Sequence, residues 1–325
     1  MPKVSVLIPV YNVEKYIERC ARSLFEQTLD DIEYVFVNDC TPDESMEILK
    51  NVIGRYPTRR SAVKLISHER NRGLATARNT GLAGATGEYV ICCDSDDWVE
   101  PGMYESMYRA AKTADADLVV CGFYDEYARH AIPRQQAFPD DNIERVRQML
   151  SGKLHCGTWN KLVRRDLYAR NGIRFPDGIN MWEDVLAMIP VCYHAVDIAC
   201  LPQPFYHYVR DNGASYTNGM KEASLQNLME AVEGIGGFLR DNALCCLEDA
   251  FCCLKLTAKL NLLLNSSGER QRERNRLYPE TGPFILSYSA VSLYWRIALK
   301  LASWNFLYGF NAMSRAGKKL CSIKK

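Results

Sequence analysis

Three carboxylates follow an apolar run in the first half of the sequence, at Asp94, Asp96 and Asp97. The residues before them, Tyr89–Cys93, have the composition of a buried strand. Two aspartates separated by one residue at the end of a rigid strand can direct oxygens at one hard cation such as Mg²⁺ or Mn²⁺. Such a cation would neutralise a substrate diphosphate. The alternative is that these acids only cap the helix expected to begin near Pro101.

Further polar residues follow the neighbouring expected strands. Asp39 ends the second strand, and Asn71 and Arg78 follow the third, while Pro9 and Tyr11 come at the end of the first. Ligands of a parallel sheet bind beyond the carboxyl ends of its strands, so we expect these side chains to converge with the three carboxylates. The guanidinium of Arg78 could reach phosphate oxygens with its forked donors. The alternative is a surface loop and a helix with a solvated arginine.

The elements that must position these residues alternate between two patterns over the first 125 residues. Short runs rich in branched and aromatic residues alternate with longer helical patterns, which favours a parallel sheet covered by helices on both faces. The expected strands are Val4–Pro9, Ile32–Val37, Val63–Ser67, Glu88–Cys93 and Leu118–Cys121, and the expected helices are Val13–Phe25, Asp43–Tyr56, Leu74–Ala83 and Pro101–Ala114.

The rest of the chain has a different pattern. Tyr124–Asp141 is polar and aromatic with two prolines, which predicts a loop or boundary. Glu183–His194 predicts a helix, and Ile198–Leu201 and Phe205–Val209 predict two short strands. From residue 221 onwards the pattern is helical, interrupted at Asn265–Pro279, where the run GERQRERNR predicts a solvated loop or a helix end.

The composition limits the class of protein. The 325 residues carry 40 basic and 39 acidic side chains, a formal net charge of +1 that gives no global reason to expect nucleic acid as a partner. The 13 cysteines form no CxxC pairs, which favours buried free thiols in a reducing compartment over zinc ligands or disulfides. The N-terminus lacks the features of a signal peptide, and no stretch is long and apolar enough to span a membrane. We therefore expect a cytoplasmic protein.

Four segments, taken together, resemble the family 2 glycosyltransferases, which have the GT-A nucleotide-sugar-binding fold. These segments are VSVLIPVYN, VNDCTPD, NRGLATARNTGL and GEYVICCDSDDW, and they cover about residues 3–125 in the family's order and spacing. Looser family-like pieces follow at Trp159–Leu162, Met181–Asp184 and Tyr206–Arg210, with Ser215 beyond them.

The resemblance implies roles for the residues at the strand ends. Asp39 would hydrogen-bond the edge of uracil or another base, and the residues after the first strand would line the base pocket. Asp94 and Asp96 match the family's Asp-x-Asp motif, with Asp96 as the direct ligand of Mn²⁺ or Mg²⁺ and Asp94 nearer the ribose and sugar. The residues that it implies at the nucleotide-sugar are Pro9, Tyr11, Asp39, Asn71, Arg78, Asp94, Asp96 and Arg210.

Asp184 resembles the family's catalytic base. Inverting transfer requires a carboxylate that removes the proton of the acceptor hydroxyl as this attacks the anomeric carbon. The start of a helix would favour the ionised form of Asp184. The alternative is that Glu183 and Asp184 are only favourable acids in a first helical turn.

Two further segments resemble the family less specifically. His207 and Arg210 lie in a tyrosine-rich segment that in relatives folds over the donor diphosphate, so His207 is a further candidate metal ligand. The alternative for His207 is structural hydrogen bonding. Trp159 and Lys161 are candidates to shape the acceptor side, and the alternative is a core tryptophan beside a surface lysine.

The charged side chains near the C-terminus are all basic. No Asp or Glu occurs between Thr281 and Lys325, although seven Lys and Arg residues do. Within residues 284–310, a narrow polar stripe at helical spacing is surrounded by Leu, Trp and Tyr. This pattern predicts a helix in a membrane interface, followed by a basic tail attracted to anionic lipid. The alternative is a helix packed on the catalytic domain or on a dimer partner.

The sequence thus predicts an α/β GT-A domain with a Rossmann-like, mostly parallel sheet and a mainly helical C-terminal region. Residues 1–125 would bind the nucleotide-sugar, 126–220 would carry the acceptor site and catalytic base, and 221–325 would form a helical extension. The hypothesis is a metal-dependent, inverting hexosyltransferase that transfers a sugar from a nucleotide-diphospho-sugar, most simply a UDP-sugar, to a glycan or lipid-linked acceptor.

The expected setting is surface polysaccharide biosynthesis, peripherally on the inner face of the cell membrane. Two alternatives stay open. One is a sugar-phosphate nucleotidylyltransferase, although the N-terminus has no glycine-rich GxGxRL-type loop. The other is a non-catalytic, membrane-associated glycan-binding protein.

Overall fold

A computed structural model describes residues 1–210 and 220–323, with side chains as far as Gly317. The chain forms two compact units: Met1–Arg145 with Cys156–Ser215, and Val146–His155 with Tyr216–Lys325. Ser215 and the last two lysines, which carried part of the predictions above, lie outside the described residues. The predicted division of function at residues 125 and 220 stays a prediction, because compactness does not assign function.

The described part of the first unit contains one sheet in the order β3-β2-β1-β4-β8-β6-β9-β5, with β7 paired to β6. Strands β3, β2, β1 and β4 are parallel, and β8 is antiparallel to both of its neighbours. The expected parallel sheet is therefore confirmed for the N-terminal strands, and the sheet is mixed beyond β4. The strands are β1 (Val4–Val10), β2 (Ile32–Asn38), β3 (Val63–Ser67), β4 (Tyr89–Cys92), β5 (Trp98–Val99), β6 (Leu118–Tyr127), β7 (His130–Arg134), β8 (Lys161–Arg164) and β9 (Ile198–Val209).

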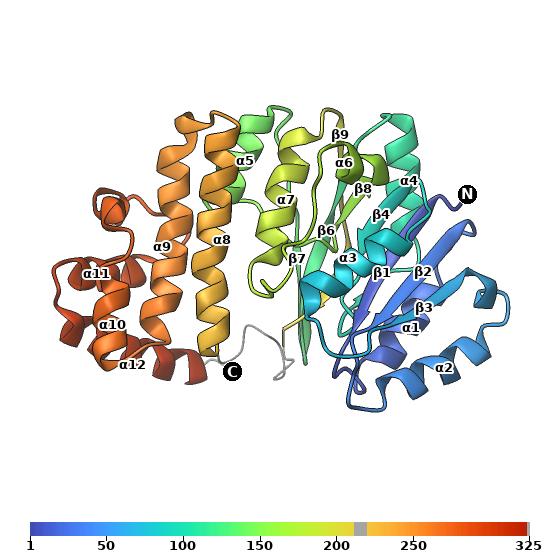
Figure 1. Cartoon of the computed structure of the whole chain (residues 1–325), viewed down its shortest axis with the longest axis horizontal. Helices are drawn as coiled ribbons and strands as arrows, with labels where there is room; N and C mark the ends of the chain where they lie inside the picture. Colours follow the sequence, from blue (N-terminus) through green and yellow to red (C-terminus); the bar gives the residue numbers. More distant parts are fainter. Residues whose placement is uncertain (211–219, 324–325) are drawn as a thin grey trace. The chain divides into compact units, whose positions relative to one another are not determined.

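Helices cover both faces of this sheet (Figure 1). Alternate residues of β1, from Val4 to Val10, pack with α1, α2 and α4 in one core, as the two-residue period of a strand requires. The opposite face packs against α3, where Gly81 lies against Leu7. The helices of this unit are α1 (Ile17–Phe25), α2 (Ser45–Arg55), η1 (Arg60–Ala62), α3 (Leu74–Gly84), α4 (Met103–Thr113), α6 (Arg165–Arg170) and α7 (Glu183–His194), while α5 (Asn142–Leu150) contains the boundary between the units.

Two predictions about the middle of the chain are wrong. Part of the expected loop Tyr124–Asp141 is strand, because β6 continues to Tyr127 and pairs with both β9 and β7. Pro133 is tolerated there since, among the described strands, β7 pairs on one side only. The two short strands expected after Ile198 are the single strand β9, whose pairing with β6 shifts register around Gly122. Long-range pairing here overrides a polar, proline-containing local sequence.

The second unit is helical, as expected, and its helices α8 and α9 lie side by side (Figure 1). The run GERQRERNR is largely the helix α10 and not a solvated loop, because Gln271 and Asn275 are buried and donate hydrogen bonds to the carbonyls of Leu263 and Ala302. The elements are α8 (Glu222–Asp241), η2 (Cys245–Leu247), α9 (Glu248–Leu264), α10 (Gly268–Asn275), η3 (Pro279–Phe284), α11 (Leu293–Ser303) and α12 (Leu307–Ile323).

The single helix expected over residues 284–310 is also wrong. The chain turns between α11 and α12, where Asn305 adopts a left-handed φ of 60°. One face of α11, with Ala298, Leu299 and Ala302, packs with Phe310 of α12 in a core shared with α9. Among the described residues, no helix has the length and apolar character needed to cross a membrane.

The cysteines with described side chains are free thiols, as predicted. Several are buried, but Cys40, Cys200, Cys245 and Cys246 are exposed, so the expectation of burial holds only for part of the set.

Candidate functional site

The polar residues predicted to converge do lie at one edge of the sheet, since β2, β1 and β4 are parallel neighbours. The loops after β1 and β2 are joined by a hydrogen bond of 2.8 Å from the backbone N–H of Asn12 to Oγ1 of Thr41. Pro9 joins β1 to the acidic turn after β4, because its carbonyl accepts a hydrogen bond of 2.7 Å from Oγ of Ser95. Tyr11 follows with a side chain that is 45% exposed.

Asp39 is buried beyond β2 and organises the loop after β3. Its carboxylate accepts hydrogen bonds of 2.8 Å from the backbone N–H groups of Arg72 and Gly73, and one oxygen lies 2.7 Å from Nδ1 of His68. Asp39 thereby positions the loop that contains the exposed Asn71. Its contact with a base stays a prediction. His68 was missed by sequence reasoning, because a lone histidine after a strand carries no pattern.

The three acids after β4 occupy different environments. Asp94 is partly exposed, whereas Asp97 is buried. Asp97 accepts hydrogen bonds of 2.7 Å from the hydroxyl of Tyr206 and from the backbone N–H of Val209. Burial, together with the nearby Asp96 and Asp94, raises the pKa of Asp97 well above its ordinary value. Asp97 therefore connects the acidic turn to β9 and does not act as a simple helix cap.

Arg78 connects the acidic turn to the start of α7. Its Nη2 donates to Asp94 at 2.8 Å and its Nη1 donates to Glu183 at 2.6 Å. The side chain is only 3% exposed, so the solvated arginine considered above is excluded. Burial alone would lower the pKa of Arg78, but Asp94 and Glu183 raise it well above its ordinary value. We call this arrangement the Asp94–Arg78–Glu183 bridge.

Asp184, next to this bridge, is half-buried in the first turn of α7. Its Oδ1 accepts a hydrogen bond of 2.8 Å from the backbone N–H of Val185. Burial raises the pKa of Asp184, and the positive charges of Arg78 and Lys161 oppose that effect. Burial likewise raises the pKa of Glu183 against the lowering effect of Arg78. The site thus places two neighbouring acids of raised pKa together, and one of them, Glu183, is also ion-paired to Arg78.

The segment before α7 is held on α3 by side chains that the sequence pattern did not single out. Asn79 makes two hydrogen bonds with the backbone of Phe175, at 2.7 and 3.0 Å, and Oγ1 of Thr76 donates to Asp177 at 2.8 Å. Asn180 packs against Gly73, where an added Cβ would lie 2.4 Å from its amide. These contacts fix the approach of α7 to the sheet edge.

His207 is buried between two aromatic rings. Its ring lies 3.4 Å from the centroid of Trp98 and 4.5 Å from that of Tyr124, nearly parallel to both. Its two nitrogens are each 2.9 Å from a carboxylate oxygen, Nδ1 from Glu126 and Nε2 from Glu100. Both nitrogens are engaged, which agrees with the structural alternative. Its role as a metal ligand stays a prediction that nothing in this geometry favours.

Arg210 and the Trp159–Lys161 segment make contacts within the protein, and their roles at the donor and the acceptor stay predictions. Arg210 donates to Asp125 at 2.7 Å and lies over the ring of Tyr208. Trp159 is buried and stacks on Tyr206. Lys161 is not a surface lysine, because it is 1% exposed and its Nζ donates to the carbonyl of Gly157 at 2.7 Å.

The two partly buried acids of the turn after β4 have the chemistry to hold a divalent cation. In the described part of the chain, no three His, Cys, Asp or Glu side chains gather as a complete metal site. Mg²⁺-type sites commonly use one or two carboxylates, with substrate phosphates supplying the other oxygens. Asp94 and Asp96 match that donor set, since both are only partly buried at the strand end.

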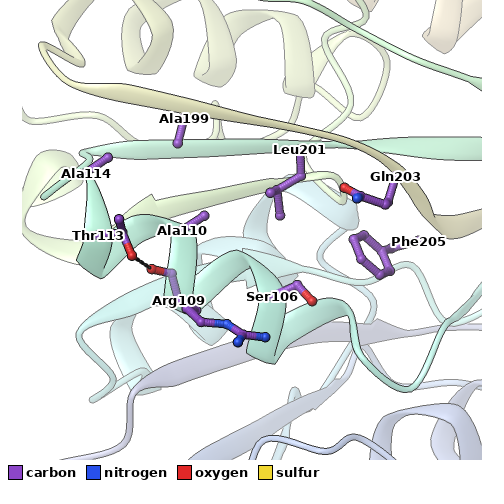
Figure 2. A pocket seen from close by; sticks show the side chains of 9 residues that line it. All are labelled: Ser106, Arg109, Ala110, Thr113, Ala114, Ala199, Leu201, Gln203 and Phe205. Carbon is purple, nitrogen blue, oxygen red and sulfur yellow. Dashed lines mark hydrogen bonds between the residues drawn. The ribbon is translucent and has the colours of Figure 1, made fainter.

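A groove of about 510 Å³ lies elsewhere, between α4 and β9. Figure 2 shows the apolar side chains of Leu201 and Phe205 in its wall beside Ala110 of α4. Its lining includes none of the predicted site residues. The candidate site is therefore defined by the strand ends and not by this groove.

Comparisons with known proteins identify the family and the fold of the chain. Residues 5–172 match the family model of glycosyl transferase family 2. The uncharacterized glycosyltransferase EpsJ of Bacillus subtilis (strain 168) is 34% identical over 224 residues, which cover 67% of this chain and 63% of EpsJ. The match therefore spans less than two thirds of that relative's own length.

Two solved structures show the fold. S. aureus TarS 1-349 in complex with UDP-GlcNAc has a TM-score of 0.70 at 20% identity, over 98% of this chain and 92% of that one. The mannosyltransferase PcManGT from Pyrobaculum calidifontis, in complex with GDP-Man and Mn²⁺, has a TM-score of 0.50 at 19% identity, over 96% and 87%. The first unit thus has the expected GT-A fold, and the chain belongs to glycosyl transferase family 2.

Proposed function

We propose that this protein is an inverting, metal-dependent glycosyltransferase of the hexosyltransferase type that uses a nucleotide-diphospho-sugar, in the first instance a UDP-sugar. The observation that carries this proposal is the Asp94–Arg78–Glu183 bridge. It joins the Asp-x-Asp motif on the donor side to the start of α7, where the candidate base Asp184 lies. This contact supports the proposal because it brings the proposed donor-side and acceptor-side residues into one cluster.

In the proposed reaction, Asp184 removes the proton of an acceptor hydroxyl as its oxygen attacks the anomeric carbon. The new bond joins that oxygen to the anomeric carbon, and the bond to the diphosphate breaks with its electron pair on the nucleoside diphosphate. Asp96 and Asp94 would hold Mn²⁺ or Mg²⁺, which when bound neutralises the charge of the diphosphate. Asp39 and its loop would bind the base.

Arg78 is a positioning residue in this proposal. Both of its terminal nitrogens bond to carboxylates, so it orients Asp94 and holds Glu183 beside Asp184. Its positive charge also opposes the rise in the pKa of Asp184 that burial causes. Hydrogen bonds from such a supporting residue to the groups that touch the substrate fix the orientation of those groups.

The transfer rate should fall on acidification at a higher pH than an ordinary aspartate would give. A base acts only when ionised, and burial raises the pKa of Asp184, so its ionised fraction falls as the pH drops through that raised pKa. We expect log kcat/KM to decrease by about one unit per pH unit on the acidic limb. A pH–rate profile, with donor binding measured at each pH, checks this. A rate that stays constant down to pH 4 while the donor remains bound would contradict the role of Asp184.

Donor and metal can be tested together by thermal shift and nucleotide release. UDP-, GDP- and TDP-sugars are compared with Mn²⁺, Mg²⁺ or EDTA. We expect stabilisation and slow release of nucleoside diphosphate with a UDP-sugar and Mn²⁺, and neither in EDTA. Asp96→Asn should lose the stabilisation and the nucleotide release that depend on the metal. Asp166→Asn should keep both, because Asp166 is an exposed acid on α6.

Other outcomes would replace the proposal. Pyrophosphate release from a sugar-1-phosphate and a nucleoside triphosphate would identify a nucleotidylyltransferase. Glycan binding without any release of nucleotide would identify a non-catalytic binding protein. Equal donor binding in EDTA and Mn²⁺ would remove the metal from the proposal and leave the transferase intact.

For the acceptor, we propose a glycan or a lipid-linked saccharide in surface polysaccharide assembly. The proposed location is the cytoplasm, peripherally at the inner face of the cell membrane. The exposed apolar and basic residues of the second unit support this location.

A further inference from the structure

The helices α11 and α12 expose large apolar side chains at the turn that joins them. Trp304, Phe306 and Tyr308 are 68%, 52% and 81% exposed, and Leu293 and Ile297 on α11 are 57% and 43% exposed. Soluble surfaces rarely gather so many large apolar side chains unless they contact something. We call these five residues the C-terminal aromatic surface.

The spacing on α11 shows that this exposure is systematic. Leu293, Ile297, Lys300 and Trp304 recur at steps of four, three and four residues and so form one stripe of the helix. The opposite residues of α11 are already packed in the core of the second unit. The exposed stripe is therefore a second apolar stripe of α11, in addition to the one that packs in the core of the second unit.

The charged groups on these helices are all cationic. Lys300 lies in the stripe, with its Nζ 5.6 Å from the ring centroid of Trp304. On α12, Arg315 is exposed seven residues after Tyr308, on the same side of that helix. The sequence has no acidic residue from Thr281 to Lys325. A negatively charged partner surface is complementary to this pattern, and a second copy of the same cationic surface is not.

We propose that the C-terminal aromatic surface, with Lys300 and Arg315, docks the protein on an anionic lipid bilayer. Trp and Tyr side chains suit the boundary between head groups and acyl chains, and Lys and Arg are attracted to anionic head groups. The contact is peripheral and needs no spanning helix. This inference deepens the proposed function by placing the enzyme beside a membrane-borne acceptor.

Vesicle co-sedimentation of the full chain tests the proposal without any donor, so its failure leaves the transferase proposal untouched. We expect binding to vesicles of phosphatidylglycerol and phosphatidylcholine, little binding to phosphatidylcholine alone, and loss of binding in high salt. The triple variant Leu293→Ser/Trp304→Ser/Tyr308→Ser should bind at least tenfold more weakly. Lys300→Gln/Arg315→Gln should lose about fivefold per removed charge.

Val196→Ser is the matched control, because this side chain is 75% exposed in the first unit. It should bind vesicles like the unchanged protein, and circular dichroism should show that all variants are folded. Equal binding of the triple variant and the unchanged protein would overturn the proposal. So would equally tight binding to neutral vesicles, or light scattering that shows a dimer which the triple variant converts to a monomer.

Discussion

Replacing Asp184 by asparagine is expected to lower kcat by about 10³-fold, within the range of roughly 10² to 10⁴ typical of a general base. The amide cannot accept the proton of the acceptor hydroxyl, although it keeps the size of the side chain. UDP affinity in Mn²⁺, measured by calorimetry, should change by less than about threefold, because the role proposed for Asp184 is on the acceptor side. The rate is measured as transfer from the donor that the thermal-shift comparison identifies.

Asp166→Asn provides the matched control, since it removes one exposed negative charge at the start of α6. Its transfer rate should equal that of the unchanged protein. Asp184→Glu should recover part of the activity, because it restores a carboxylate in a shifted position. Full activity of Asp184→Asn would show that another group, or water alone, accepts the proton.

Replacing Arg78 by methionine is expected to lower the free energy of unfolding of the first unit by about 3–5 kcal/mol, the usual effect of removing one partner of a buried ion pair. Glu183, which is buried, and Asp94 would both lose their cation. We also expect a loss of activity of about 10–100-fold, because the acids that we propose to touch the substrate would lose their orientation. Equilibrium urea unfolding measures the first effect, and hydrogen exchange at α3 and α7 localises it.

Three variants make this prediction specific. Arg70→Met removes an exposed arginine from the same strand-end region and should change the unfolding free energy by less than about 0.5 kcal/mol. Arg78→Met/Glu183→Gln should be more stable than Arg78→Met, because one buried charge fewer is left unpaired. Arg78→Lys keeps the charge but lacks the planar fork that reaches both carboxylates, so it should recover stability better than activity. An Arg78→Met variant with the same free energy of unfolding as the unchanged protein would show that the bridge does not stabilise the fold.

The parallel half of the fold could be predicted because its signals are local. Each of the first four strands is a short, mainly apolar run. The helix Leu74–Gly84 follows Gly73, whose φ is 88°, and glycine is the residue type that adopts this conformation most easily. The β6–β9 pairing could not be predicted, because its strands are about 80 residues apart and contain prolines and charges. Arg134 and Arg210 form ion pairs with the buried Asp125 of β6, and these ion pairs cannot be recognised in any short segment of the sequence.

The candidate site was predictable in its residue types but not in their contacts. The strand ends identified Asp39, Asp94 and Asp96, since parallel strands bring their ends together. The contact of Arg78 with Glu183 was not predictable, because Glu183 lies 105 positions away and meets Arg78 only through the packing of α7 on the sheet edge. For the same reason, the contacts of Asn79 with Phe175 and of Asn180 with Ala75, which join α3 to the segment before α7, became visible only in three dimensions.

The Asp94–Arg78–Glu183 bridge also constrains how this sequence can change over generations. Loss of Arg78 leaves the buried Glu183 without its counterion, and loss of Glu183 or Asp94 removes one of the two counterions of the buried Arg78. Each single substitution would therefore give an intermediate that is less stable than the original sequence. Related sequences should therefore either retain all three residue types or replace them together. A lineage that has altered only one of them would be expected to carry a compensating cation or a neutral side chain nearby.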